Sequence, residues 1–203
     1  VLYELRYSGA TRTGGEGADT LAGVVNRAKL EQMGPEVRVN LGAGHEAPTE
    51  YLNVDRRVLE GIDVVAEVGD LPFEPGSLAE IFSAHLLEHI PLEELRRVLL
   101  PYWVSLLRPA GRFVAVVPDM ETMINECAAG RISYSDFREV AYGSQEYEGD
   151  FHFNGFSRDL LTSALLEVGL SNVRIVEHAR RNGLCYEMQV EGTRPGSGPA
   201  VER

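Results

Sequence analysis

A short strand-like segment that runs straight into two glycines is the feature that most constrains the fold of this chain. The pattern of residues 37–41 is typical of a short strand, and Gly42, Ala43 and Gly44 follow at once. Glycine lets the backbone turn sharply and lets a ligand approach without meeting a Cβ atom. The segment therefore predicts a strand followed either by a ligand-binding loop or by a simple tight turn.

Acidic residues stand at the ends of the next two expected strands. Asp55 closes residues 51–54, and Asp70 with Leu71 follows residues 62–68. In open α/β sheets, ligands bind beyond the carboxyl ends of the strands. The carboxylate of Asp55 can accept hydrogen bonds from both hydroxyls of a ribose. The alternative is that it caps a short helix that begins directly after it.

Apolar strands alternate with amphipathic helices along most of the chain. The expected strands are residues 37–41, 51–54, 62–68, 78–83, 113–117, 173–178 and 184–190. The expected helices are residues 17–32, 92–107, 120–128, 134–142 and 157–168. This alternation predicts an α/β fold with a mostly parallel, seven-stranded sheet covered on both faces. The last two strands read as a hairpin, which makes the final strand antiparallel.

One connection is unusually short. Ten residues, 45–54, separate Gly44 from Asp55, whereas a parallel crossover usually takes a dozen or more. We expect a shortened first crossover, with its helix short or absent. The spacing also disfavours a nicotinamide dinucleotide site, where the acid follows the glycine loop by about 20 residues.

The length of 203 residues suits one domain with one core. We expect that domain to span residues 1–191, with a leader and helix at 1–36 and an insertion or lid at 119–156. Residues 192–203 are rich in Gly, Pro and Ser and predict a disordered tail.

Composition argues against several classes of function. The net charge of −12 disfavours nucleic-acid binding, which needs a basic surface. The sequence has no apolar run of the roughly 18–20 residues that span a membrane, and we expect no signal peptide. The two cysteines, Cys127 and Cys185, do not suggest a disulfide framework. We expect a cytoplasmic protein that acts on a small molecule, with no nucleic-acid or membrane partner.

Five segments arrive in the order of a known family. They are residues 40–44, 53–55, 69–73, 83–90 and 107–113. Together they resemble the class I S-adenosylmethionine-dependent methyltransferases, in particular a compact bacterial subgroup. The resemblance implies a Rossmann-like, doubly wound sheet, with S-adenosylmethionine as cofactor and S-adenosylhomocysteine as product. The chain departs from the pattern at Asn40, where many members carry an acid, and in lacking a third glycine.

The resemblance also implies roles for the matching residues. The methionine part of the cofactor would lie against Leu41, Gly42, Ala43 and Gly44. The ribose would meet Asp55, the adenine Asp70 and Leu71, and the methyl group Ala84 and His85.

His85, Glu88 and His89 also match H-x-x-E-H, the inverted zinc-protease pattern. Pro91 follows too closely to leave much helix for presenting both imidazoles, and no third ligand stands out. We therefore expect no metal, and keep a zinc hydrolase only as a minor alternative. In the preferred interpretation, His85 lines the cofactor site.

Methyl transfer to a hydroxyl benefits from a base, and histidine is the usual choice near neutral pH. His152 and His85 are the candidates, with His152 preferred. The aromatic and polar residues around the expected lid are candidates for acceptor binding: Tyr142, Tyr147, Phe151 and Asn154.

The leading hypothesis is O-methylation of a small molecule such as a sugar or secondary metabolite. The main alternative is a non-catalytic nucleotide-binding or regulatory module with the same fold. The N-terminal helix either covers the cofactor or packs in a homodimer.

Overall fold

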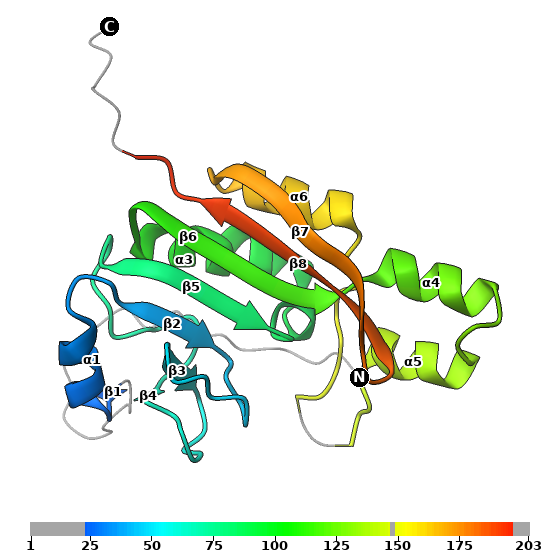
Figure 1. Ribbon diagram of the computed structural model, residues 1–203, viewed down its shortest axis with the longest axis horizontal. Helices are drawn as coiled ribbons and strands as arrows, with labels where there is room; N and C mark the ends of the chain where they lie inside the picture. Colours follow the sequence, from blue (N-terminus) through cyan, green and yellow to red (C-terminus); the bar gives the residue numbers. More distant parts are fainter. Residues whose placement is uncertain (1–22, 147–148, 197–203) are drawn as a thin grey trace, which may run out of the picture.

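The computed structural model describes residues 23–146 and 149–196, and the fold is built on one mixed sheet (Figure 1). Its strands are β1 (Gly23–Val24), β2 (Arg38–Leu41), β3 (Leu52–Asp55), β4 (Val64–Val65), β5 (Leu78–Ala84), β6 (Leu107–Pro118), β7 (Ser171–Asn182) and β8 (Cys185–Thr193). They lie in the order β1-β4-β3-β2-β5-β6-β8-β7. The strands from β2 to β6 are parallel, β8 is antiparallel to both β6 and β7, and β1 is antiparallel to β4.

This topology confirms the mostly parallel sheet and the antiparallel last strand. The predicted strand count of seven is wrong, because β1 adds an eighth strand at the edge. The chain winds outward from β2 through β3 to β4 and then returns to β5 on the other side of β2. The carboxyl ends of β2 and β5 therefore flank the switch point where ligands bind in such sheets.

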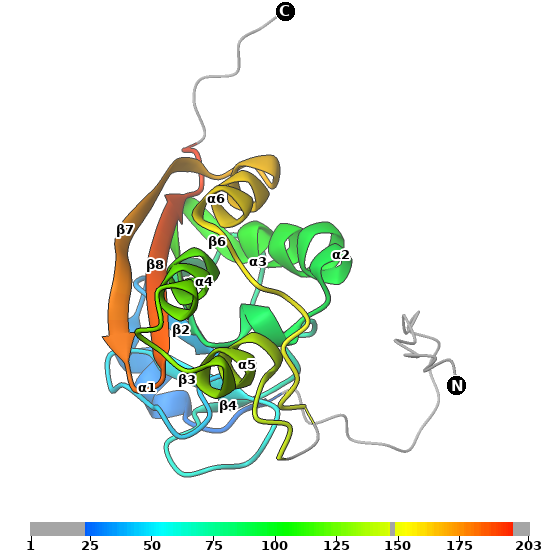
Figure 2. The same cartoon turned by 90° about the vertical axis from the view of Figure 1, so that its right-hand side faces the viewer.

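The described helices lie on one face of the sheet, beyond one of its ends or, in the case of the first helix, beside the edge strand β1 (Figure 1). They are α1 (Arg27–Met33), the 3-10 turn η1 (Leu87–His89), α2 (Leu92–Glu94), the π-helical turn η2 (Leu95–Leu99), α3 (Leu100–Leu106), α4 (Met120–Ala128), α5 (Tyr134–Tyr142) and α6 (Arg158–Glu167). Figures 1 and 2 show α3 and α6 behind β5, β6, β8 and β7, whereas α4 and α5 lie beyond the ends of β6 and β8. None of the described helices is long and apolar enough to cross a bilayer.

The main core lies between the sheet and α3 and α6. Trp103, Phe113 and Phe156 are among its largest fully buried side chains. The Trp103 indole stacks on Phe113 with ring centroids 6.3 Å apart and donates a 2.7 Å hydrogen bond from Nε1 to the Val68 carbonyl. That bond fixes the chain just after β4 to the helical layer.

The shortened first crossover is confirmed, and the shortening extends further than the sequence predicted. None of the next three connections contains a helix: β2 joins β3 through residues 42–51, β3 joins β4 through residues 56–63, and β4 joins β5 through residues 66–77. The prediction of helices covering both faces is therefore wrong for the described residues. Only the β5 to β6 crossover, through α2, η2 and α3, carries helices along the parallel part of the sheet.

The ends of the described chain also differ from prediction. In place of a helix over 17–32, Gly23–Val24 pairs with β4, and α1 begins after the cap Asn26; the leader at 1–16 lies outside the described residues. Gly192 and Thr193 belong to β8, not to a tail. A Cβ atom on Gly192 would stand 3.2 Å from Leu170 and Val173, so this glycine serves close packing within the sheet.

Candidate functional site

The glycine loop turns at the carboxyl end of β2 and is tied to the end of β3. Gly42 and Gly44 have φ angles of 69° and 55°, a conformation that glycine adopts at little cost. The Ala43 amide donates to the Val54 carbonyl at 3.0 Å, and the Gly44 amide donates to Asp55 Oδ2 at 2.9 Å. Loop and acid thus form one unit at the carboxyl edge of the sheet.

Asp55 is a buried, ionised carboxylate within that unit. Burial by itself raises its pKa, but hydrogen bonds from the Arg57 side chain, the Arg57 amide and the Gly44 amide outweigh it and bring the pKa below its ordinary value. Arg57 Nε lies 3.0 Å from Asp55 Oδ1. Asp55 does not cap a helix, because residues 56–63 form none.

Asp70 and Leu71 follow β4 but point in different directions. Asp70 is exposed, whereas the Leu71 side chain is only 6% exposed and packs in the core. The Leu71 amide donates to the Tyr102 hydroxyl at 2.7 Å. Because its side chain is buried, Leu71 can offer a ligand only its backbone. The backbone amide is already hydrogen-bonded to the Tyr102 hydroxyl.

His85 follows Ala84 at the end of β5 and is held between two carboxylates. Its backbone has a φ of 50°, which is uncommon for a residue other than glycine. Its Nε2 lies 2.8 Å from Glu187 Oε2, and its Nδ1 lies 3.1 Å from Glu88 Oε1. The hydrogen bond to Glu88, opposed by burial and aided by Glu187, raises the pKa of His85 to about 9. The imidazole is therefore a cation at neutral pH, with both nitrogens engaged.

The sequence reasoning missed Glu187. It lies on β8, 102 residues from His85, and both β8 and β5 flank β6. A charged residue at an otherwise buried strand position was the available signal, since Glu187 is only 4% exposed. Arg180 and Asn182 of β7 also donate to its carboxylate.

His152 does not lie beside His85 but edge-on to His89, with ring centroids 4.6 Å apart. Its Nδ1 donates to the Val140 carbonyl at 2.7 Å, and His89 Nδ1 donates to the Phe151 carbonyl at 3.2 Å. Burial lowers the pKa of His89. His85 and His89 do not share one helical face, because Leu87–His89 is a single 3-10 turn.

The remaining acceptor candidates occupy different environments. Tyr142 and Phe151 are 55% and 45% exposed, so both can meet a ligand. Asn154 instead donates from Nδ2 to the Ile90 carbonyl, which is a structural contact. Tyr147 lies outside the described residues. Phe156, which follows shortly after Asn154, is fully buried in the core.

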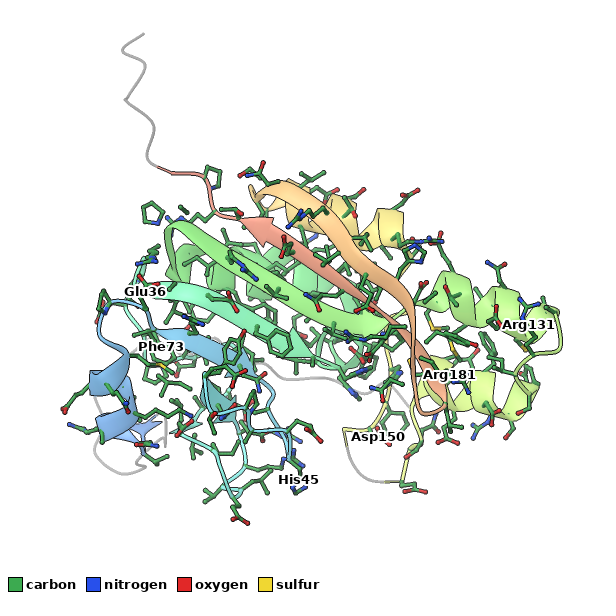
Figure 3. All side chains as sticks on the ribbon, viewed as in Figure 1. Glu36, His45, Phe73, Arg131, Asp150 and Arg181 are labelled. Atoms are coloured by element: carbon green, nitrogen blue, oxygen red, sulfur yellow. The ribbon has the colours of Figure 1, made fainter. Side chains whose placement is uncertain are left out.

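The segment after α5 reaches the same edge of the molecule as the glycine loop. Figure 3 shows Asp150 of this segment and His45, which follows the loop, at that edge. A Cβ atom on Gly149 would stand 3.4 Å from Nη2 of Arg56, the residue after β3. The expected lid therefore contacts the chain that follows Asp55.

Comparisons with known proteins give a consistent result for this architecture. No family model matches the sequence, and no curated protein matches it. Among solved structures, a *Burkholderia thailandensis* 1,6-didemethyltoxoflavin-N1-methyltransferase is similar at 14% identity and a TM-score of 0.55, over 84% of this chain and 78% of that one. A SAM-dependent methyltransferase from Archaeoglobus fulgidus is similar at 15% identity and a TM-score of 0.55. That match covers 83% of this chain and 92% of the other.

A third similar structure is *Haemonchus contortus* phosphoethanolamine N-methyltransferase 2, at 15% identity and a TM-score of 0.51. The match covers 84% of this chain but only 52% of that enzyme, so the chain spans about half its length. The chain has the fold of the class I S-adenosylmethionine-dependent methyltransferases. The resemblance drawn from the sequence is confirmed at the level of the fold, while the compact bacterial subgroup is not confirmed.

Two side chains crowd the space around the glycine loop and Asp55. Arg57 lies on the Asp55 carboxylate and keeps 48% of its side chain exposed. A Cβ atom on Gly42 would stand 2.9 Å from Leu86 Cδ1. Leu41 and Ala43 are buried in the core, so only the backbone of this loop can meet a ligand.

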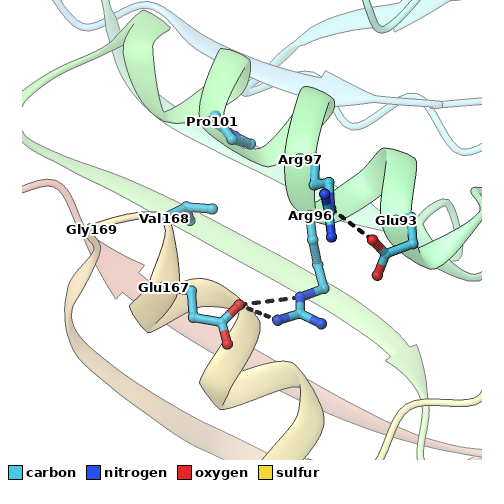
Figure 4. A pocket seen from close by; sticks show the side chains of 7 residues that line it. All are labelled: Glu93, Arg96, Arg97, Pro101, Glu167, Val168 and Gly169. Atoms are coloured by element: carbon cyan, nitrogen blue, oxygen red, sulfur yellow. Dashed lines mark hydrogen bonds and ion pairs between the residues drawn. The ribbon is translucent and has the colours of Figure 1, made fainter.

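A surface pocket lies away from the edge of the sheet that carries the glycine loop and Asp55. It encloses about 570 Å³ between the α2 to α3 segment and the end of α6. Figure 4 shows Arg96 paired with Glu167 across it and Arg97 paired with Glu93 along the helix. The second, of about 360 Å³, lies beside α1 and Pro72. Since Arg96 and Arg97 are already paired with these carboxylates, the larger pocket offers no free charge to an anionic ligand.

Proposed function

We propose that this protein is an S-adenosylmethionine-dependent methyltransferase that methylates an oxygen atom of a small molecule. One observation carries the proposal: the Gly44 amide and the ionised Asp55 carboxylate meet at 2.9 Å beside the switch point of a methyltransferase-type sheet. Because the similar structures share at most 15% identity with this chain, activity and substrate rest on the site.

The residues at the strand ends would hold the cofactor in a defined order. Asp55 would accept hydrogen bonds from the ribose once Arg57 moves away. The backbone of Gly42 to Gly44 would lie against the methionine part. Asp70 and Leu71 would meet the adenine, and the Leu71 amide would have to exchange the Tyr102 hydroxyl for the ligand. Ala84 and the cationic His85 would stand beside the methyl group, where His85 acts as a positioning residue.

When bound, S-adenosylmethionine supplies an electrophilic methyl group whose bond to sulfur breaks as the acceptor oxygen bonds to carbon, leaving the electron pair on sulfur. Holding the oxygen close and aligned removes several kcal/mol of the barrier. The acceptor hydroxyl must also lose its proton. His152 suits that step better than His85, because its Nδ1 donates to Val140 and leaves Nε2 free to accept a proton.

Tyr142 and Phe151 would form an exposed aromatic rim for the acceptor, with Tyr147 and Asn154 nearby in the chain. A compact, uncharged or cationic acceptor fits a chain of net charge −12 better than a polyanion does. This favours a sugar or secondary metabolite over nucleic acid.

Calorimetric titration with S-adenosylhomocysteine tests the cofactor site. We expect one site of micromolar affinity, weakened at least tenfold by Asp55→Asn. Asp159→Asn is the matched control, since Asp159 is exposed in the first turn of α6. Equal affinity in wild type and Asp55→Asn would overturn the assignment of Asp55.

One observation favours the alternative of a non-catalytic module with this fold. Arg57 lies on Asp55, and Leu86 fills the space beside Gly42, so the cofactor has to displace side chains on entry. If wild type shows no binding of S-adenosylhomocysteine at millimolar concentration, the non-catalytic module becomes the better account.

A further inference from the structure

Three potential metal ligands from distant parts of the chain converge beside the end of β5. Glu88 and His89 lie in η1, and His152 lies in the segment that leads to α6. One ligand atom from each lies within 4.8 Å of the others. The H-x-x-E-H pattern suggested a different set, which included His85 and lacked His152.

The backbone holds this trio together. The Phe153 and Asn154 amides both donate to the Glu88 carbonyl, at 2.7 and 3.2 Å, and the His152 amide donates to the Tyr142 carbonyl at 3.1 Å. The segment that carries His152 is thus bound to η1 just after the histidine and to the end of α5 at the histidine itself. The arrangement does not depend on exposed, freely rotating side chains.

Each histidine keeps the nitrogen that a metal needs. Because Nδ1 of His152 and Nδ1 of His89 donate to backbone carbonyls, the Nε2 atom of each ring carries the lone pair. Metal-binding histidines in proteins are commonly oriented in this way, by a carbonyl or carboxylate on the other nitrogen. The two imidazole rings also lie against each other, with centroids 4.6 Å apart and planes at 85°.

The third ligand is an unsatisfied buried carboxylate oxygen. Glu88 is 1% exposed, and its Oε1 contacts His85. No hydrogen-bond donor among the described residues reaches its Oε2, which has no solvent contact. A buried carboxylate oxygen without a partner costs free energy, and a cation bound to it would remove that cost.

We propose that Glu88 Oε2, His89 Nε2 and His152 Nε2 bind one divalent transition-metal ion of the zinc class. Two imidazoles and a carboxylate suit Zn²⁺, Co²⁺ or Ni²⁺ better than Mg²⁺ or Ca²⁺, which prefer oxygen ligands. Metal–ligand bonds of about 2 Å hold ligand atoms roughly 3–4 Å apart, so the three side chains, which place ligand atoms within 4.8 Å of one another, have to draw together around the ion. Three protein ligands leave at least one position open.

The site suggests how the proposed methyl transfer loses its proton; this step, unlike the metal binding, rests on the proposed function. Glu88 joins the two centres, with Oε1 on His85 at the end of β5 and Oε2 on the metal. An acceptor hydroxyl in the open position is acidified by the metal, and its proton passes to solvent. With the metal bound, His152 Nε2 is a ligand, and the metal takes over the task for which His152 serves as the base in the metal-free protein.

Metal titration of the full chain without a polyhistidine tag tests the site. After chelator treatment and removal of the chelator, ZnCl₂ is titrated by calorimetry and CoCl₂ by visible absorption. We expect one ion per chain, with affinity lowered at least tenfold in both His152→Ala and Glu88→Gln. His178→Ala is the matched control, because His178 is an exposed histidine on β7, and it should bind like wild type.

Two results overturn the proposal: no stoichiometric ion in wild type, or wild-type affinity in both His152→Ala and Glu88→Gln. Circular dichroism in chelator checks that each variant folds, and Glu88→Gln preserves side-chain shape if His152→Ala does not fold. S-adenosylhomocysteine affinity is measured on the same samples. Retained S-adenosylhomocysteine binding without metal binding removes only the metal site, whereas metal binding without S-adenosylhomocysteine binding removes only the proposed function.

Discussion

At the scale of single residues, the buried carboxylate of Asp63 organises the amino-terminal half of the sheet. It accepts hydrogen bonds from the Asn53 amide at 3.0 Å, from Lys29 Nζ at 2.7 Å and from Asn26 Nδ2 at 2.7 Å. Its backbone carbonyl accepts the amides of Val25 and Asn26. One side chain therefore ties α1 and β1 to β3 and β4, where no crossover helix does so.

We predict that Asp63→Asn lowers the free energy of unfolding by about 1–3 kcal/mol at pH 7. Burial raises the pKa of Asp63, but the hydrogen bonds from Asn53, Lys29 and Asn26 outweigh it and leave the pKa below its ordinary value. The stabilisation is therefore present above the unfolded pKa of about 3.9 and is lost as the pH falls through the lower folded pKa.

Urea denaturation of wild type and Asp63→Asn at pH 7 and pH 3 measures this effect. The difference between the two proteins should narrow at pH 3. Asp159→Asn, on the exposed face of α6, should stay within about 0.5 kcal/mol of wild type at pH 7. A difference for Asp63→Asn that is the same at both pH values would contradict the prediction.

Gly42 offers a second prediction at the residue scale. Gly42→Ala would be destabilised in two ways. The backbone φ of 69° is strained for alanine, and the added Cβ atom would stand 2.9 Å from Leu86 Cδ1. Gly76→Ala is the matched control, because Gly76 has a φ of 75° and nothing within 4 Å of an added Cβ atom. We expect about 1 kcal/mol of destabilisation for Gly76→Ala and clearly more for Gly42→Ala. Thermal unfolding of both variants measures the difference. Equal losses of stability would show that the Leu86 side chain moves away at no cost, and would contradict the prediction.

At the scale of elements, the end of β8 is fastened onto the start of β6. The Arg194 amide donates to the Gly111 carbonyl at 2.8 Å, and the Ala110 amide donates to the Arg194 carbonyl at 3.0 Å. The Arg194 guanidinium also donates to the carbonyls of Ser105, at 2.9 Å, and Leu107. The end of α3 and the start of β6 thus depend on a residue that the sequence placed in a tail.

We predict that Arg194→Ala lowers the free energy of unfolding by about 1–3 kcal/mol, because carbonyls that now accept charged hydrogen bonds lose their donor. Arg174→Ala is the matched control: Arg174 pairs with Glu191 on the surface with 70% of its side chain exposed, and exposed pairs contribute little. Urea denaturation of both variants measures the two changes in the free energy of unfolding. The prediction is wrong if Arg174→Ala is the more destabilising change.

At the scale of the whole molecule, the two halves of the sheet are supported unequally. β5 and β6 are long strands of 7 and 12 residues, and β6 packs on α3. β4 has only two residues, and the connections on either side of it contain no helix. The glycine loop, Asp55 and Asp70 all belong to the less supported half.

We predict that native-state hydrogen exchange is slowest in β5 and β6 and markedly faster in β3 and β4. Amides exchange through local opening, which costs less where fewer buried contacts must break. Mass spectrometry of peptides from each strand measures the rates. If the proposed function is correct, S-adenosylhomocysteine should slow exchange in β3 and β4 more than in β6; equal protection of all four strands without ligand would contradict the asymmetry.

The sequence by itself determined the parts of this protein that depend on neighbours in the chain. Local pattern predicted the turn at Gly42 and Gly44, the strand that ends at Asp55, the strand over 78–83 and the helical stretch over 92–107. The structure agrees to within a residue, although the helical stretch is divided into α2, η2 and α3. Glycine conformations, strand alternation and helix periodicity are local preferences, so they can be predicted without knowing what packs on them. The roles of the cofactor-binding residues stay predictions until a ligand is measured.

Only the tertiary structure decided which side chains meet. Glu187 reaches His85 across 102 residues of sequence because β8 and β5 both neighbour β6. His152 reaches His89 because its segment docks on the Glu88 carbonyl. Such contacts depend on strand order and on the path of a loop between elements. The charge of His85 and the three converging ligands therefore could not be predicted from local sequence.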